Sequence, residues 1–217
     1  MLTYRIPRGL GFVSGRSFCD NCKKSLPWYY NVPLLSYVIL KARSGCCGKS
    51  ISVRYPLIEL TTLIGSFLVL FFSPGAIYLL VFYLTFTILV IDIENQIIPD
   101  ELSFILFILY TLFFSGNLIY QGLFTGLFYS LIFLLIYFAT KGKGMGLGDV
   151  KLVVVLGMWF SLYQGLIWLT LSFVTGGLYG IVIVLLKKGK LKTKVAFGPF
   201  LIIAFWITVF SIKYLGF

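Results

Sequence analysis

Four long stretches of the chain contain no charged side chain, at 60–91, 102–140, 152–186 and 195–212. A helix needs about 20 apolar residues to cross a bilayer. The first three stretches are therefore each long enough for two spans, and the fourth fits one. Only 12% of the 217 residues are charged, whereas soluble domains carry about 25%. The sequence predicts an all-α, polytopic membrane bundle of about seven spans.

A polar or bend-prone segment lies near the centre of each of the three longest stretches. These segments are "SPG" at 73–75, "SGNLIYQG" at 115–122 and "SLYQG" at 161–165, and we expect a tight turn at each. A chain in lipid must satisfy its own backbone hydrogen bonds, and no strand-like alternation favours a barrel. Helical hairpins are therefore the expected building units.

Lysine and arginine gather before residue 56, at 141–151 and at 187–194. The positive-inside rule places all three groups in the cytoplasm. The formal net charge of +11 then reflects the topology of the chain in the membrane. We expect the lipid bilayer to be a partner of the protein and do not expect nucleic-acid binding. We expect no secretory signal peptide, since the N-terminus lacks an apolar core region. No internal repeat of 20–50 residues is apparent.

The first 55 residues contain all four cysteines and half of the basic residues. Cys19 and Cys22 form a CxxC pair, whereas Cys46 and Cys47 are adjacent. Two CxxC knuckles are typical of a tetrahedral zinc site. We therefore predict a cytoplasmic, zinc-knuckle-like cysteine domain at 1–55 and a transmembrane domain at 56–217.

The altered second pair leaves alternatives open. Adjacent cysteines ligate one metal only with a strained backbone, so either Cys46 or Cys47 is a bystander, with three-cysteine ligation, or the segment holds no metal. Four free or disulfide-paired thiols are a further alternative. A cytoplasmic location disfavours disulfides, because that compartment keeps thiols reduced.

Two of the seven acidic residues stand where apolar runs meet the membrane edge. Asp92 ends the second predicted span, and Asp149 follows glycines in "KGKGMGLGDVK". One out-and-back hairpin separates them, so both emerge on the same face and their carboxyl groups can come close together. Gly146 and Gly148 permit unusual dihedrals and close backbone approach.

Two carboxyl groups in one site do not both ionise cheaply, so one keeps its proton and the other acts as a base. Such a pair hydrolyses peptides without a metal, and the absence of histidine excludes a Ser-His-Asp mechanism. The alternative is that these acidic residues, and Glu94, Asp100 and Glu101 with them, are solvated loop charges. Lys151 is either a positive-inside anchor or a neighbour that tunes the pair.

The sequence resembles the bacterial type IV prepilin peptidases, of the GxGD aspartyl protease group. The resemblance runs in order through most of the chain. It is carried by "YRIPRG", "GRSFCDNCKKSLPWY", "PLLSY", "CGKSISVRYPLIEL", "IDIENQIIPDEL", "GMGLGDVKL" and "FGPFL".

The resemblance implies an aspartyl endopeptidase of the bacterial cytoplasmic membrane that removes the basic leader of type IV prepilins or pseudopilins. Asp92 and Asp149 fall on the catalytic positions, and Gly146 and Gly148 are the GxGD glycines. Glu94, Asp100 and Lys151 are candidate supporting residues. The resemblance also implies N-methylation of the new N-terminus with S-adenosylmethionine, associated with the cysteine domain, for which Cys19, Cys22, Cys46 and Cys47 are the candidate zinc ligands.

Two departures from the family pattern affect these expectations. Ser44 stands where the second pair usually has its first cysteine, which puts zinc binding and methylation in doubt. Relatives also begin with a span that ends near "YRIPRG", so this chain is expected to have seven spans where the family has eight.

Three competing interpretations differ in testable ways. Presenilin-like proteases share GxGD but carry tyrosine before the first aspartate, where this chain has Ile91, and lack the cysteine domain. Archaeal preflagellin peptidases also lack that domain. A transporter or proton relay predicts carboxylates in the middle of spans, not at their ends.

Overall fold

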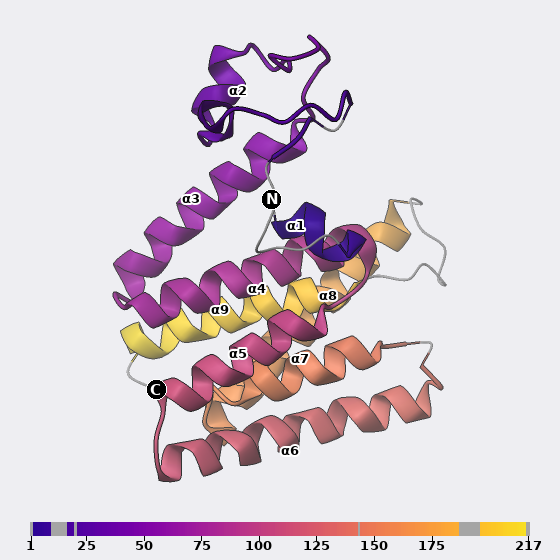
Figure 1. Ribbon diagram of the computed structural model, residues 1–217. Coiled ribbons are helices and arrows are strands. Elements are labelled where there is room, and N and C mark those ends of the chain that lie inside the picture. Colours follow the sequence, from indigo (N-terminus) through magenta and orange to yellow (C-terminus); the bar gives the residue numbers. More distant parts are fainter. Residues whose placement is uncertain (1, 10–16, 20, 143, 187–195, 216–217) are drawn as a thin grey trace. The chain divides into compact units, whose positions relative to one another are not determined.

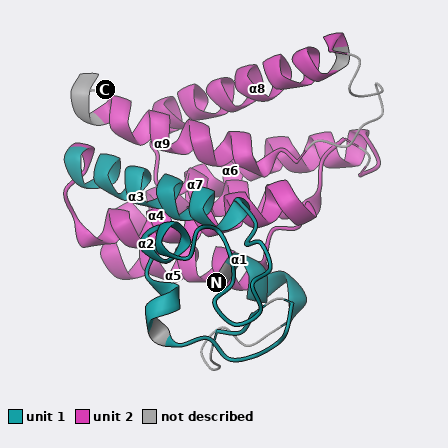
Figure 2. Ribbon diagram, turned by 90° about the horizontal axis from the view of Figure 1, so that it is seen from above, with its two compact units in different colours: residues 1–71 teal, residues 72–217 magenta. Residues whose placement is uncertain are grey.

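The computed structural model describes residues 2–9, 17–19, 21–142, 144–186 and 196–215 (Figure 1). The chain divides into two compact units, Met1–Phe71 and Phe72–Phe217 (Figure 2). Apart from two isolated bridges, the described residues form helices, turns and irregular segments. The all-α prediction is therefore confirmed. The basic cluster at 187–194 and Asp20 lie outside the described residues.

The first unit contains short helices and most of one long helix. These are α1 (Leu2–Arg5), η1 (Ile6–Arg8), η2 (Trp28–Asn31), α2 (Leu35–Ile39) and α3 (Arg54–Phe72). The second unit contains α4 (Ala76–Asn95), α5 (Asp100–Phe113), α6 (Asn117–Ala139), α7 (Leu147–Gly157), α8 (Leu162–Leu185) and α9 (Gly198–Leu215). The seven helices from α3 to α9 correspond to the seven predicted ones. The turns before α6 and α8 are shorter than expected, because both helices begin within the predicted turn segments.

Four helices of the described chain are long and apolar enough to cross a membrane: α3, α4, α6 and Leu162–Ile183 of α8. The others are shorter, and α7 has only 11 residues. At about 1.5 Å per residue, α7 extends roughly 16 Å, about half of the hydrocarbon core. The bundle is thus a membrane protein in which α5 and α7 do not have the length of full spans.

The outer face of α6 shows the signature of a lipid-facing helix. Large apolar side chains recur every three or four residues and are exposed. They are Phe124, Leu127, Leu131, Leu135 and Phe138. Exposure of such a stripe to water would be unfavourable in free energy, whereas in a bilayer the same side chains contact acyl chains of similar polarity.

The short helix α7 lies inside the second unit. It packs mainly against α6 and also against α5 and α9. Most of its residues are buried: Asp149, Val150, Leu152, Val153, Val155, Leu156 and Gly157. Two glycines allow α6 and α7 to approach closely, since a Cβ built on Gly157 would lie 3.1 Å from the Cα atom of Gly126. Small residues serve this purpose in membrane helix pairs.

Helix α9 is joined to both of its neighbours by buried indole hydrogen bonds. Trp206 Nε1 donates to Thr85 Oγ1 of α4 at 3.1 Å. Trp168 Nε1 of α8 donates to the carbonyl oxygen of Leu201 at 2.9 Å. Because interhelical hydrogen bonds fix register in an apolar medium, these contacts determine where the first residue of α9 lies.

The α6–α7 contact yields a stability prediction. A methyl group added at Gly126 points into the backbone of Val154 and the side chain of Met158, so Gly126→Ala should lower the free energy of unfolding by about 1–3 kcal/mol, as overpacking does. Thermal unfolding in detergent measures the effect.

Gly177→Ala is the matched control, because nothing lies within 4 Å of a Cβ at that position. It should leave the unfolding temperature unchanged or slightly raised, since alanine favours helix. Equal unfolding temperatures for the two variants would show that α6 and α7 are not closely packed at Gly126.

Candidate active site and metal centre

The four cysteines of the first unit converge. The Sγ atoms of Cys19, Cys22, Cys46 and Cys47 all lie within 4.8 Å of one another. Cys19 Sγ is 3.8 Å from Cys47 Sγ, and Cys22 Sγ is 3.1 Å from Cys46 Sγ. Four thiolates around zinc, each about 2.3 Å from the metal, are separated by about 3.8 Å. The arrangement fits a tetrahedral metal ion, and the Sγ atoms of both Cys46 and Cys47 belong to the cluster.

Two similar knuckles produce this convergence. In the first, Cys19 N donates to Lys24 O, and Phe18 is bridged to Ser25. In the second, Ser44 N donates to Lys49 O, and Arg43 is bridged to Ser50. Each knuckle also contains a residue with positive φ, Lys23 or Gly48. The second knuckle thus has the same backbone hydrogen-bond and bridge pattern as the first. The two segments differ in where their cysteines stand, so the residue types alone do not show this similarity.

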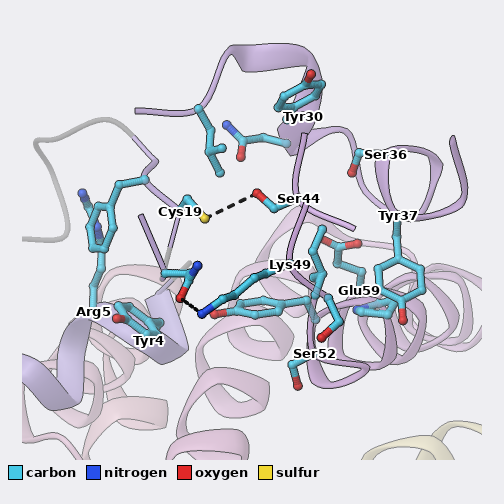
Figure 3. A pocket seen from close by; sticks show the side chains of 18 residues that line it. Tyr4, Arg5, Cys19, Tyr30, Ser36, Tyr37, Ser44, Lys49, Ser52 and Glu59 are labelled. Carbon is cyan, nitrogen blue, oxygen red and sulfur yellow. Dashed lines mark hydrogen bonds between the residues drawn. The ribbon is translucent and has the colours of Figure 1, made fainter. Parts of the chain in front are cut away.

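The repeat explains the displaced cysteine. Ser44 occupies the place that Cys19 has in the first knuckle, and its Oγ lies 3.4 Å from Cys19 Sγ (Figure 3) and 3.1 Å from Cys46 Sγ. Cys46, two residues after Ser44, places its Sγ atom in the cluster instead. Hydrogen bonds from the Cys22 amide, then from Ser44 and the Asn21 amide, lower the pKa of the Cys19 thiol to about 6. A lowered pKa favours the thiolate, which is the form that binds a metal.

In the second unit, Asp92 lies in the last turn of α4. Its side chain is 4% exposed, beside the fully buried Ile91, whereas Ile93 is 60% exposed. The helix ends at Asn95, and the next residue, Gln96, has a φ of 55° and donates its N–H to Asp92 O at 2.9 Å. The Oδ2 atom of Asp92 has no hydrogen-bond partner among the described residues. Asp92 therefore faces inward, with unused hydrogen-bonding capacity.

Asp149 is the third residue of α7, not a loop residue. Its Oδ2 accepts the N–H of Gly146 at 3.1 Å, and the side chain is 8% exposed. The first amides of a helix have no partner within that helix, so a carboxylate is stabilised there. The helix start thus holds Asp149 inside the bundle rather than in water.

Gly198, the first residue of α9, brings the two aspartates together. Its backbone amide faces both carboxyl groups, and the charge of Asp149 acts on Asp92. A Cβ on Gly198 would collide with the Asp92 carboxylate and would lie 3.3 Å from the Cδ1 atom of Ile98. The end of α4 and the starts of α7 and α9 therefore meet at one buried site.

The two glycines of the GxGD motif follow only part of the prediction, which was of unusual dihedrals and close backbone approach. Gly146 has φ −85° and ψ 155°, an extended conformation that any residue adopts, so it does not use an unusual dihedral. Gly148 instead permits close approach, because its Cβ would lie 3.2 Å from Ile98 Cβ. The segment between α4 and α5 can thereby pack against α7.

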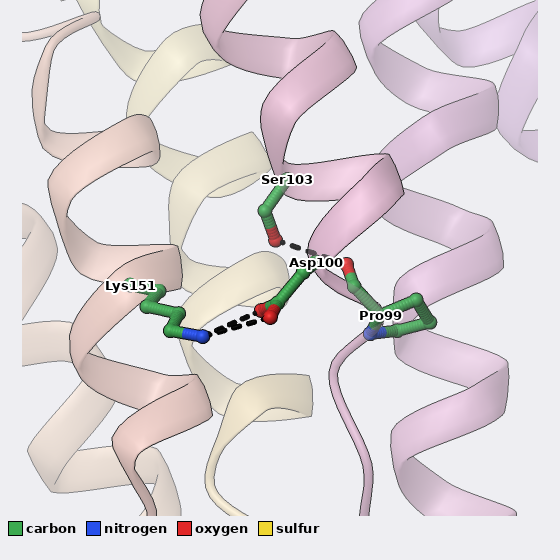
Figure 4. Close-up of polar contacts among 4 residues, drawn as sticks. All are labelled: Pro99, Asp100, Ser103 and Lys151. Atoms are coloured by element: carbon green, nitrogen blue, oxygen red, sulfur yellow. Dashed lines mark hydrogen bonds and ion pairs between the residues drawn. The ribbon is translucent and has the colours of Figure 1, made fainter.

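The other candidate acidic residues lie outside this site. Glu94 and Glu101 are exposed. Lys151 Nζ lies 2.8 Å from both carboxylate oxygens of Asp100 and so joins α7 to the first turn of α5 (Figure 4). Both side chains are more than half exposed, so the pair contributes little stability. The structure pairs Lys151 with Asp100 and not with either buried aspartate.

Sequence reasoning missed two residues of this site. Gly198 appeared only within "FGPFL", without a role, and Ile98 was not considered. A glycine that opens an apolar helix is the signal that could have identified Gly198. The contact of Ile98 depends on the packing of three helices, which the residue pattern does not contain.

Comparison with known proteins gives consistent matches along the chain. The family model for the bacterial peptidase A24 N-terminal domain matches residues 1–73, and that for the type IV leader peptidase family matches residues 79–181. No solved structure gives a significant match.

Similar curated proteins carry the name prepilin leader peptidase/N-methyltransferase. The one from Aeromonas salmonicida (strain A449) is 34% identical over 205 residues, which cover 89% of this chain and 70% of the relative. That from Pectobacterium carotovorum subsp. carotovorum is 37% identical over 206 residues, covering 86% and 71%. That from Pseudomonas aeruginosa is 32% identical over 209 residues, covering 91% and 72%.

The cysteine cluster yields a prediction on metal content. Purified protein should retain about one Zn²⁺ per chain, as expected for a four-thiolate site. Replacement of either member of the adjacent pair, Cys46→Ser or Cys47→Ser, should lower that content after dialysis, measured by elemental mass spectrometry. Ser44→Cys should retain the metal, because it supplies a further thiolate beside Cys19 and Cys46.

Ser25→Ala serves as the control, since Ser25 belongs to the first knuckle but is not one of the four thiols. A wild-type protein that neither retains nor binds Zn²⁺ on titration would contradict the metal assignment. Undiminished zinc in Cys46→Ser would restrict the site to three cysteines.

Proposed function

The chain belongs to the type IV leader peptidase family, and we propose that it removes the basic leader peptide of type IV prepilins or pseudopilins at the cytoplasmic face of the inner membrane. The observation that carries the proposal is the pair of buried aspartates, Asp92 and Asp149, at the meeting of three helix ends. Among the described residues, glycine amides and not basic side chains face these carboxyl groups.

The proposed reaction needs an acid and a base at one place. Two carboxyl groups that interact strongly share one proton, so one is a base and the other an acid at the same pH. The ionised carboxylate removes a proton from a water molecule, which attacks the scissile carbonyl carbon. The protonated carboxyl hydrogen-bonds to the carbonyl oxygen and then supplies a proton to the departing amine. We assign Asp92 and Asp149 to these roles as a pair.

The surroundings of the pair support this assignment. The Oδ2 atom of Asp92 has no partner among the described residues, and buried polar atoms without partners are rare outside functional sites. A water molecule or a proton shared with Asp149 would satisfy it. The Gly146 amide orients Asp149 through its second oxygen. Asp149 is thus held by the Gly146 amide, whereas Oδ2 of Asp92 accepts no hydrogen bond from a described residue.

The arrangement of the loops supports cytoplasmic cleavage. In Figure 1 the end of α4, the start of α5, the end of α6 and the start of α7 lie at the same end of the second unit. Asp92 belongs to the last turn of α4 and Asp149 to the first turn of α7. Lys141 belongs to the connection between α6 and α7, and the cluster at 187–194 to that between α8 and α9, and such charge favours the cytoplasmic side. A substrate leader that remains in the cytoplasm would reach the pair from that end.

The names of the relatives favour a second activity. We propose that the chain also N-methylates the new N-terminus, with S-adenosylmethionine as methyl donor and a zinc-bound cysteine domain, residues 1–55, that acts beside a peptidase domain, residues 56–217. Cys19, Cys22, Cys46 and Cys47 would hold the zinc. The ion would fix the two knuckles and has no part in the proposed proteolysis.

The carboxylate pair is tested by isosteric replacement. Asp92→Asn and Asp149→Asn should each reduce leader removal from a full-length prepilin by at least about 10³-fold, the scale on which loss of a catalytic group acts. Gel shift and mass spectrometry of the product measure cleavage. Both variants should elute and unfold like the wild type.

Glu101→Asn is a control that changes an exposed carboxylate outside the pair. It should leave the cleaved bond and the rate within about twofold of the wild type. If either Asn variant at the pair cleaves as fast as the wild type, the aspartyl mechanism is wrong.

Gly198 is tested by the smallest possible side chain. Gly198→Ala places a methyl group against the Asp92 carboxylate and should lower kcat by about 10²-fold, since displacement of a catalytic group by about 1 Å has effects of this size. Gly180→Ala, where a Cβ meets nothing within 4 Å, is the matched control. A Gly198→Ala enzyme with unchanged kcat would show that the start of α9 does not position Asp92.

A further inference from the structure

The connection between α4 and α5 passes beside the carboxylate pair and turns one apolar side chain toward it. Residues 96–99 separate the two helices. Within this connection Ile97 is 55% exposed, whereas Ile98 is half-buried and Pro99 is buried. Two isoleucines that are neighbours in the chain thus have different surroundings, and Ile98 is the one that turns inward.

Ile98 fills the space beside two glycines at the starts of helices. A Cβ on Gly148, in the first turn of α7, would lie 3.2 Å from Ile98 Cβ and 3.6 Å from its Cγ1 and Cδ1 atoms. A Cβ on Gly198, the first residue of α9, would lie 3.3 Å from Ile98 Cδ1 and would also collide with the Asp92 carboxylate. One side chain therefore lies against the starts of two helices, at the point where the carboxyl group of Asp92 lies.

The place of Ile98 in the sequence makes its side chain stiff. Ile98 precedes Pro99, and the residue before a proline is biased toward an extended backbone. A β-branched side chain also has few χ1 rotamers. Ile98 therefore has fewer conformations open to it than a leucine or a methionine elsewhere in the chain, which suits a spacer between helix ends.

Hydrogen bonds anchor the connection at both of its ends. At the first end, Gln96 N donates to Asp92 O at 2.9 Å. At the second end, the backbone N and the Oγ of Ser103 each donate to Pro99 O at 3.3 Å (Figure 4). The backbone on both sides of Ile98 is thus fixed, and so is the position from which its side chain reaches the two glycines.

The coupling of two carboxyl groups depends on their separation and on the medium between them. The Coulomb energy of two charges falls with distance and with the effective dielectric constant. Among the described residues, the charge of Asp149 and the Gly198 amide act on Asp92, and the Gly146 and Gly198 amides act on Asp149. An apolar side chain that spaces the helix starts and excludes water would keep this coupling strong.

We propose that Ile98 is a positioning residue for the two aspartates: its side chain sets the spacing of the starts of α7 and α9 and keeps water away from the carboxyl groups. The proposal rests on the peptidase function proposed above and names a residue that keeps its two carboxyl groups coupled. In this role Ile98 contacts neither the scissile bond nor the attacking water, and it acts through Asp92 and Asp149. A residue that only filled apolar space would affect stability but not the joint titration of the pair.

The test compares Ile98→Ala with Ile98→Val in the full chain in detergent. Ile98→Ala removes the Cγ1 and Cδ1 atoms and should lower kcat for leader removal at least about tenfold, because a displacement of about 1 Å at a catalytic group has effects of this size or larger. KM should stay within about twofold of the wild type, since no contact with the substrate is lost. Ile98→Val keeps the β-branched shape and should stay within about threefold of the wild-type kcat.

The pH profile supplies the readout that a purely structural role would not move. Two carboxyl groups that share one proton give a bell-shaped profile of kcat/KM. Weaker coupling in Ile98→Ala should bring the two limbs of the bell closer together by about one pH unit. A smaller folded fraction lowers the rate at every pH but does not change the width of the bell.

Ile97→Ala is the matched control, because it makes the same change in the neighbouring, exposed isoleucine. Its kcat and KM should lie within about twofold of the wild type, as for most exposed positions, and its pH profile should be unchanged. Elution volume and unfolding temperature are compared for all variants, and rates are measured well below the lowest unfolding temperature.

A second readout does not need cleavage. In protein labelled with ¹³C at the aspartate carboxyl carbons, an NMR titration follows the two buried groups directly, with Asp92→Asn and Asp149→Asn to assign their signals. The wild type should show two interacting titration steps. Ile98→Ala should bring these steps closer together by about one pH unit, and Ile97→Ala should not.

The outcomes separate positioning from the peptidase itself. An unchanged pH profile and an unchanged NMR titration in Ile98→Ala overturn the proposal, whether or not kcat falls. A raised KM at unchanged kcat also overturns it, because Ile98 would then contact the substrate. A wild type whose two carboxyl groups titrate jointly, in a way that Ile98→Ala weakens, but which does not cleave prepilin supports the positioning role and contradicts the proposed peptidase.

Discussion

The second unit depends on how two carboxyl groups are buried in an apolar bundle. A carboxyl group removed from water needs hydrogen-bond donors, and backbone donors without partners occur in a helix only at its start. Asp149 lies at the start of α7, where it binds the Gly146 amide, and the start of α9 presents the Gly198 amide to both aspartates. The positions of α7 and α9, and through them the packing of α4 and α6, follow from this requirement.

A different constraint governs the first unit, which is too small and polar to rely on an apolar core. Its knuckles are short turns with few buried side chains, and domains of this kind are commonly stabilised by a metal. The four converging thiols supply the ligands for such a metal. The proposed metal would therefore stabilise the first unit, whereas the proposed proteolysis uses the carboxyl groups of the second unit.

Hydrophobic patterning was sufficient to predict the helices, and hairpin connectivity was sufficient to place Asp92 and Asp149 at the same end. The patterning did not show that α7 begins before Asp149, because glycines are equally compatible with a loop and with a helix start. Gly198 was missed because its contact with Asp92 joins residues far apart in the chain. Cys46 appeared displaced because spacing rules count residues, whereas the second knuckle brings its sulfur to the cluster. The catalytic and metal roles of these residues stay predictions.

Asp92 and Asp149 are proposed to act as one acid–base pair, and the pH dependence of kcat/KM for leader removal tests this most directly. A pair that shares one proton is active only between two macroscopic pKa values, so the profile should be bell-shaped. Two prepilins with different leader sequences would separate enzyme from substrate titration. We predict the same bell-shaped pH profile of kcat/KM for both substrates. A rate that rises with pH to a plateau, or does not vary, would contradict the pair and leave at most one aspartate in the chemistry.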